Sequence, residues 1–169
     1  MNDSITRKWI MPLGFVLVAI AVQVLLVNPL YLWGWCFPYV YIVALICLPV
    51  IPRWAEILIG AAAGFLMDVC CSSAGMHTSA CVLLSFLRPM LLTGMVQETE
   101  RITGAVMMLS IGVSQFVRLA LILCLLHHAV VFFLDAWSMP LLGITAIRWI
   151  ISSAVSLAFI LLYGRLRTL

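Results

Sequence analysis

The sequence predicts an all-α integral membrane protein with six transmembrane helices. Of its 169 residues, 66% are hydrophobic and only 9% are charged, whereas soluble domains carry about 25% charged residues. Several apolar stretches approach or exceed the roughly 18 residues with which a helix crosses a bilayer. A membrane β-barrel would instead show short segments of alternating hydrophobicity. The composition therefore indicates a bundle of membrane-spanning helices.

We expect the six spans to form one domain over residues 1–169, because no linker or low-complexity tract interrupts the chain. The first span follows the basic pair Arg7-Lys8 and ends at Asn28-Pro29. The second is short for a hydrocarbon core of about 30 Å, so it should borrow length from its aromatic flanks or thin the bilayer locally. The expected spans are 9–27, 37–51, 55–71, 77–95, 104–126 and 141–163.

The later spans are separated by turn-forming and polar segments. The fourth span carries Pro89, which should kink the helix or end it early because proline lacks the backbone donor. The fifth is expected to end before His127-His128, which we interpret as an interfacial polar pair. The separating segments are Ser72 to Gly75, Thr93 to Thr103 and Asp135 to Pro140.

The distribution of basic residues predicts that both termini lie in the cytoplasm. Loops on the cytoplasmic side of a membrane protein carry an excess of lysine and arginine. With six spans, the outer loops 28–36, 72–76 and 127–139 receive none. Arg88 joins the inner set if its side chain snorkels inward. The inner residues are Arg7, Lys8, Arg53, Arg101, Arg165 and Arg167.

Three further charges fall inside predicted spans and at similar depth. Asp68 and Arg118 lie about 20 and 22 Å from the inner ends of their helices, and Arg148 lies about 12 Å from the outer start of its own. Charges inside a membrane normally face the protein interior. We therefore predict a cluster of Asp68, Arg118 and Arg148. It is either an ion-pair clamp or an outward cavity for an anion or lipid headgroup, with proton coupling as a third hypothesis.

Glu56, Gly60, Gly64 and Asp68 recur every four residues and so share one helix face. The G-x-x-x-G spacing allows close approach of another helix. With Gly75, this face is the candidate helix-packing or partner surface. Asp68 itself either has a structural role, in which it caps the helix end or makes one ion pair, or has a specific functional role.

No enzymatic, metal or cofactor motif is present. Adjacent His127 and His128 would point about 100° apart on a helix, which disfavours a shared metal ion. The basic residues are scattered, so nucleic acid is not an expected partner. The six cysteines show no zinc-ligand spacing and are interpreted as small apolar side chains. They are Cys36, Cys47, Cys70, Cys71, Cys81 and Cys124.

The run Gly64-Phe65-Leu66-Met67-Asp68, followed after a short turn by Gly75, resembles the rod shape-determining protein MreD family. That family is short, has five or six spans, and often carries Gly-Phe-x-x-Asp and then a glycine before the next helix. The aromatic residues Phe132, Phe133 and Trp137, which follow the His127-His128 pair, also fit the resemblance.

The resemblance implies a non-enzymatic component of the cell-elongation machinery in the bacterial inner membrane. Such a protein binds MreC and helps regulate the peptidoglycan synthase RodA with its class B penicillin-binding protein. The family is thought to share its architecture with the S components of energy-coupling-factor transporters. A small-molecule, vitamin-type S component is therefore the alternative. Family roles extend only to Gly64, Asp68 and Gly75.

Overall fold

The computed structural model describes residues 9–30, 36–96, 105–136 and 142–167 of the chain. Over these residues the protein is helical, and four helices are long and apolar enough to cross a membrane. These are α4 (Arg53–Cys71), α5 (Met76–Met95), α7 (Val113–Ala136) and α8 (Leu142–Leu166). The all-α fold class and the membrane-embedded character predicted from the sequence agree with this architecture.

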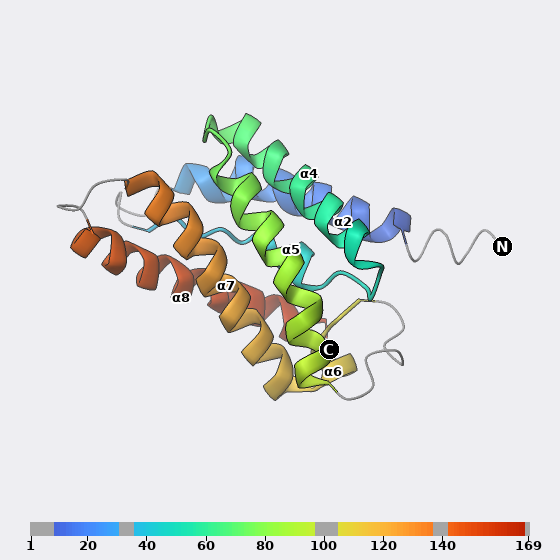
Figure 1. The fold of residues 1–169 in the computed structure, drawn as a ribbon. Helices are drawn as coiled ribbons and strands as arrows, with labels where there is room; N and C mark the ends of the chain where they lie inside the picture. The colour runs from blue at the N-terminus through green and yellow to red at the C-terminus, as the bar shows by residue number, and fades with distance from the viewer. Residues whose placement is uncertain (1–8, 31–35, 97–104, 137–141, 168–169) are drawn as a thin grey trace.

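The first helix is continuous over the length of the first predicted span. It begins as α2 (Met11–Val22), continues as a π-helix η2 (Gln23–Val27) and ends as a 3₁₀ turn η3 (Asn28–Leu30). Helix α4 packs on α5, α5 on α7, and α7 on α8, so the long helices form a connected bundle (Figure 1). Exposed large apolar side chains such as Leu58 and Phe65 cover the outside of α4, as expected for a face in contact with lipid.

The second predicted span is not a transmembrane helix. Of residues 37–51, only α3 (Ile42–Ile46) is α-helical, and the residues on either side are irregular. We call residues 36–52 the threading segment, because it passes between the helices behind α5 (Figure 1). Its central part, Tyr41 to Leu48, is at most 5% exposed. Pro38 and Pro49 bracket this part and disfavour a continuous helix, since each lacks a backbone donor.

The threading segment runs lengthwise beside α8. The backbone N–H of Phe37 donates to Ser152 near the middle of α8, while Cys47 lines a cavity together with Tyr163 near the end of that helix. From Ser152 to Tyr163, α8 rises about 16 Å. The segment thus follows the second half of α8 toward the C-terminal end of that helix. Irregular backbone at membrane depth is tolerated only where protein or a water-filled cavity surrounds it.

The fifth span is shifted along the chain relative to the prediction of 104–126. A short helix α6 (Met108–Ile111) precedes it and ends at Gly112, whose φ of 85° interrupts the helix. Helix α7 then continues to Ala136, so the predicted outer loop begins inside a helix. Helix α5 contains Pro89 and still extends to Met95, so the proline does not end it early. The loop Thr93 to Thr103 lies largely outside the described residues.

Candidate functional site

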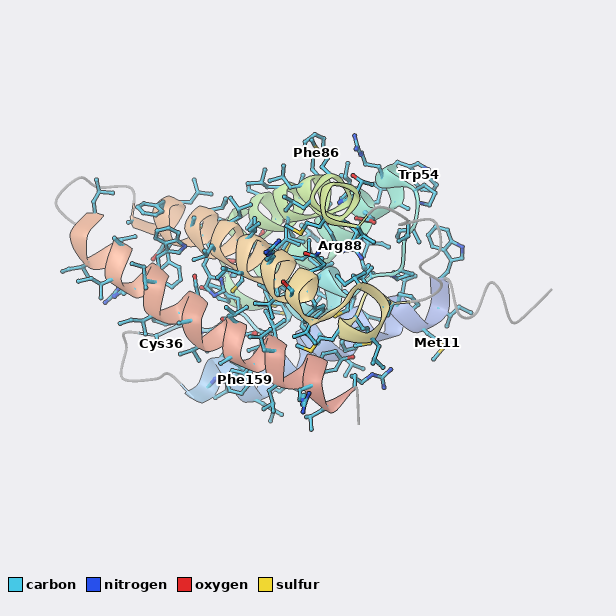
Figure 2. The ribbon with its side chains drawn as sticks, turned by 90° about the horizontal axis from the view of Figure 1, so that it is seen from below. Met11, Cys36, Trp54, Phe86, Arg88 and Phe159 are labelled. Carbon is cyan, nitrogen blue, oxygen red and sulfur yellow. The ribbon has the colours of Figure 1, made fainter. Side chains whose placement is uncertain are left out.

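A cavity of about 440 Å³ opens at one end of the bundle. This volume falls in the range of small-molecule sites. The cavity is bounded by the end of α4, the start of α5, the end of α7 and the start of α8, and Cys36 marks this end in Figure 2. It draws residues from all three segments predicted to be outer loops. Its lining includes Asn28, Cys36, Tyr39, Cys71, Ser73, His77, Phe132, Asp135 and Arg148.

Asp68 is the cap of helix α5. Its Oδ1 accepts hydrogen bonds from Ser73 Oγ at 2.6 Å and from the backbone N–H of His77 at 3.0 Å. Its Oδ2 accepts from the Thr78 backbone N–H at 2.9 Å and from Thr78 Oγ1 at 2.6 Å. Backbone donors in the first turn of a helix lack intrahelical partners, and a carboxylate there also opposes the helix dipole favourably. Among the predicted roles, the observed hydrogen bonds correspond to helix capping, but the capped helix is α5 and not α4, in which Asp68 stands.

The turn between α4 and α5 requires a left-handed backbone. Ser72, Ala74 and Gly75 have φ values of 55°, 44° and 89°. Glycine adopts such angles without a steric penalty, and it stands immediately before α5. The turn thereby delivers the first amides of α5 to the carboxylate of Asp68.

The glycine face of α4 packs directly on α5. A Cβ built at Gly60 would lie 2.1 Å from Ser85 Oγ and 2.8 Å from the Cys81 carbonyl oxygen. One built at Gly64 would lie 2.5 Å from Thr78 Cα. The two backbones are therefore too close for any side chain at these positions. This is the helix–helix contact that the G-x-x-x-G spacing predicts.

Beneath the cavity lies a buried polar cluster centred on Tyr41. The phenolic oxygen of Tyr41 is 2.8 Å from His127 Nε2, 3.3 Å from His77 Nδ1 and 3.1 Å from Cys81 Sγ. All four side chains are almost fully buried. Tyr39 packs edge-on against His77 and also lines the cavity. The cluster joins the threading segment to α5 and α7 at the base of the cavity.

The two adjacent histidines lie inside the bundle, so the prediction of an interfacial pair is wrong. His127 and His128 are both 0% exposed. They do point in different directions, as their adjacency on a helix requires. His127 reaches Tyr41, whereas His128 Nε2 lies 3.0 Å from Ser156 Oγ. Within the described ranges, no group of three or more histidine, cysteine or acidic side chains is arranged to hold a metal ion.

Polar side chains of the helices satisfy the backbone of the threading segment. Gln23 Oε1 accepts from the N–H groups of Val40 and Tyr41 at 2.7 and 3.2 Å, and its Nε2 donates to the Pro38 carbonyl at 2.9 Å. On α8, serine hydroxyls accept the amides of residues 37 and 39. These are bonds that a helix would have made internally.

The other end of the threading segment is held by Arg88 of α5, which is 0% exposed. Its Nε donates to the Ile46 carbonyl at 2.9 Å, and its Nη2 donates to the carbonyl of Leu48. Its Nη1 forms a 2.7 Å ion pair with Glu56 of α4. In Figure 2 Arg88 points into the bundle, while Phe86, two residues before it, points out. The guanidinium therefore ties three segments together and does not snorkel to the surface.

The predicted charge cluster is not assembled as an ion-pair clamp in the structure. Arg118 is exposed on α7, and Arg148 is half-buried at the cavity. Across the described part of the chain, no ion pair joins Asp68 to Arg118, and the hydrogen bonds to the Asp68 carboxylate come from Ser73, His77 and Thr78. Arg148 lines the cavity together with Ser73 and His77, which are two of the residues that donate to Asp68.

Sequence reasoning overlooked the Arg88–Glu56 pair, although a signal was present. Glu56 begins the glycine face of α4, and Cys81, Ser85 and Arg88 follow one another at helical spacing on α5. When α4 and α5 pack antiparallel through these small-residue faces, Glu56 at the end of one face lies opposite Arg88 at the end of the other. This arrangement predicts a buried ion pair.

The fold defines an all-α, membrane-embedded protein with four helices, within the described residues, that are long and apolar enough to cross a bilayer. The cysteines are all free thiols. No family model, curated protein or solved structure matches the chain.

Proposed function

We propose that this chain is a non-enzymatic, multi-pass scaffold of the bacterial inner membrane, of the rod shape-determining MreD kind. In this role it binds MreC and helps to regulate lateral peptidoglycan synthesis by RodA and its class B penicillin-binding protein. The observation that carries the proposal is the geometry of the Gly64-to-Gly75 element, on which the resemblance to MreD rests.

Gly64, Asp68 and Gly75 each have an architectural role in that element. Gly64 permits backbone contact with α5, Asp68 caps α5, and Gly75 adopts the left-handed turn conformation. All four hydrogen bonds to the Asp68 carboxylate come from the chain itself. A motif used in this way supports a rigid helical hairpin on which other proteins can assemble.

We also propose that the chain crosses the membrane six times with both ends inside. The threading segment supplies the second crossing, between α2 and α4. Two features support this arrangement. First, residues from all three segments predicted to be outer loops line one cavity. Second, Arg53 at the start of α4 and Arg167 after α8 lie at the other end of the bundle, which the positive-inside rule assigns to the cytoplasm.

A second candidate is a small-molecule, vitamin-type S component of a transporter. The cavity of about 440 Å³, with Arg148 and Asp135 among its lining residues, favours it. A ligand with an anionic group would find a guanidinium there, and aromatic rings such as Tyr39 and Phe132 offer stacking surfaces.

Depletion of the protein in its host, scored by cell shape, tests the proposed function. The scaffold proposal predicts that rod-shaped cells swell into spheres and that MreC co-purifies with the tagged chain. Re-expression of the wild type and of Arg148→Gln should both restore rods, because Arg148 lies at the cavity and not in the hairpin. Cells that keep their shape but require a vitamin, and that Arg148→Gln fails to rescue, would contradict the scaffold and favour the transporter.

A further inference from the structure

A second cavity, of about 500 Å³, lies at the end of the bundle opposite the first. It lies between the start of α2 and the end of α8, and the threading segment forms its floor. We call it the α2–α8 groove. In Figure 2, Met11 marks this end and Cys36 marks the other. The groove is lined by Met11, Pro12, Phe15, Ala44, Cys47, Leu48, Pro49, Ala105, Met107, Tyr163 and Arg167.

The lining of the groove is apolar along almost its whole length. Phe15 of α2 stacks on Tyr163 of α8 with ring centroids 5.3 Å apart, and Ala44 and Leu48 of the floor are buried. Such a surface offers a polar solute almost no hydrogen-bonding partners. It suits a flexible hydrocarbon chain, which gains by contact area alone.

Among the described residues that line the groove, Arg167 is the one with a charged side chain. It follows the last residue of α8, and its backbone N–H donates to the Tyr163 carbonyl at 3.1 Å, which continues the helical turn. The 25 residues of α8 extend for about 37 Å, more than the hydrocarbon thickness of about 30 Å. An exposed arginine beyond that end lies at the level of the lipid headgroups.

We propose that the α2–α8 groove binds one acidic phospholipid. One acyl chain lies along Met11, Phe15 and the floor of the groove, and the phosphate accepts hydrogen bonds from the Arg167 guanidinium. Charge complementarity favours this occupant, because an apolar groove with a cation at its end matches an acyl chain that ends in an anion. Guanidinium groups bind phosphate in a bidentate manner, and basic pockets between helices recognise anionic headgroups. This inference is independent of the proposed function.

Arg165 provides the matched control for Arg167. Both arginines are exposed and lie in the same C-terminal turn, but only Arg167 lines the groove. The full chain, purified with equimolar phosphatidylglycerol and phosphatidylcholine, is analysed by native mass spectrometry. We expect one retained phosphatidylglycerol per chain, a threefold or greater loss of that species in Arg167→Gln, and no loss in Arg165→Gln. Equal losses in the two variants, or equal retention of the two lipids, would overturn the proposal.

A second pair of variants tests the acyl-chain contact without a change of charge. Ala105 lines the groove and is exposed, so Ala105→Phe fills the groove without disturbing a packed core. Ala62 is exposed on α4 and does not line the groove. Ala105→Phe should lower the phosphatidylglycerol-bound fraction at least threefold, and Ala62→Phe should leave it unchanged. If the groove instead received an apolar helix of a partner protein, or bound a lipid through its headgroup alone, the phosphatidylglycerol-bound fraction would be the same in Ala105→Phe and Ala62→Phe. Equal fractions would therefore contradict the acyl-chain contact.

Discussion

The α4–α5 hairpin and the threading segment satisfy their backbone groups in opposite ways. The hairpin is self-sufficient, because helical bonds serve its interior and the carboxylate of Asp68 serves the first amides of α5. The threading segment has five α-helical residues and depends on side chains from η2, α5, α7 and α8. Polar residues of these helices therefore act in two ways. Asp68 caps a helix of its own hairpin, whereas Gln23 and Arg88 form hydrogen bonds with the backbone of a segment that is distant in sequence.

The difference predicts where the structure is most vulnerable. A hairpin defect is local, since helices can fray or shift by small amounts. Loss of a side chain that serves the threading segment leaves buried carbonyl or amide groups with no water to replace the bond, which is costly at membrane depth.

Arg88→Leu is expected to have the largest effect. It removes the donors to the Ile46 and Leu48 carbonyls and leaves the Glu56 carboxylate buried without its partner. Breaking a buried ion pair in this way costs about 3–5 kcal/mol. The free energy of unfolding in detergent micelles measures it. Arg118→Leu is the matched control, since Arg118 is exposed. Similar stabilities of the two variants would contradict the comparison.

Gln23→Leu should be the next most destabilising change. It leaves two backbone amides and one carbonyl of the threading segment without the Gln23 side chain, at about 1–3 kcal/mol for each buried group left unsatisfied. Gln115→Leu is the control, because Gln115 Oε1 is buried and has no hydrogen-bond partner within the described residues. The same unfolding measurement should show Gln115→Leu to be neutral or stabilising. A reversed order would show that Gln23 does not support the segment.

Gly64→Ala tests the hairpin by steric means. Its Cβ would meet backbone atoms of Thr78 and His77 at 2.5–2.6 Å, so α4 and α5 must separate, at about 1–3 kcal/mol. Gly94→Ala adds the same methyl group in α5, where nothing lies within 4 Å, and should stabilise the helix by about 0.5–1 kcal/mol. Thermal unfolding in detergent would distinguish the two. Tolerance of both substitutions would show that the helices are not in close contact.

Asp68→Ala is expected to have the smallest of these effects, about 0.5–2 kcal/mol for a lost helix cap. Asp135→Ala removes an exposed carboxylate from the cavity lining and should leave stability unchanged. Amide hydrogen exchange at Thr78 gives a local measurement, because its N–H donates to Asp68. We expect the Thr78 amide to exchange faster in Asp68→Ala than in the wild type, and at the wild-type rate in Asp135→Ala. Unchanged exchange in Asp68→Ala would contradict the capping role of Asp68.

The regular parts of the fold were predictable from the sequence, and the broken part was not. Helices α4 and α5 begin one or two residues before the expected spans 55–71 and 77–95, because the local signals of Pro52 and of the turn at Gly75 decide their bounds. An apolar run such as 37–51 has no periodicity that separates a buried helix from buried irregular backbone. Its conformation is decided by Gln23, Arg88 and α8, which are distant in sequence.

The candidate site was predictable to a similar degree. The glycine face follows from spacing along one helix, whereas the capping of α5 by Asp68 was one of several open alternatives and depends on the turn and the first residues of α5. The pairing of Arg88 with Glu56, and the burial of His127 beneath the cavity, depend on how helices pack together, which composition and depth do not specify. The predicted cluster of Asp68, Arg118 and Arg148 was argued from depth and from the tendency of charges to face the protein interior. Neither determines which face of α7 carries Arg118, which is exposed.

The central claim is that residues 36–52 cross the membrane without forming a transmembrane helix. Single cysteines placed by Pro29→Cys and Arg53→Cys, in a chain whose six native cysteines are replaced by alanine, bracket this segment. An impermeant thiol reagent applied to intact spheroplasts should label Pro29→Cys and leave Arg53→Cys unlabelled until the membrane is opened. Labelling of both positions in intact spheroplasts, or of neither, would place the two ends of the segment on the same side and contradict the account.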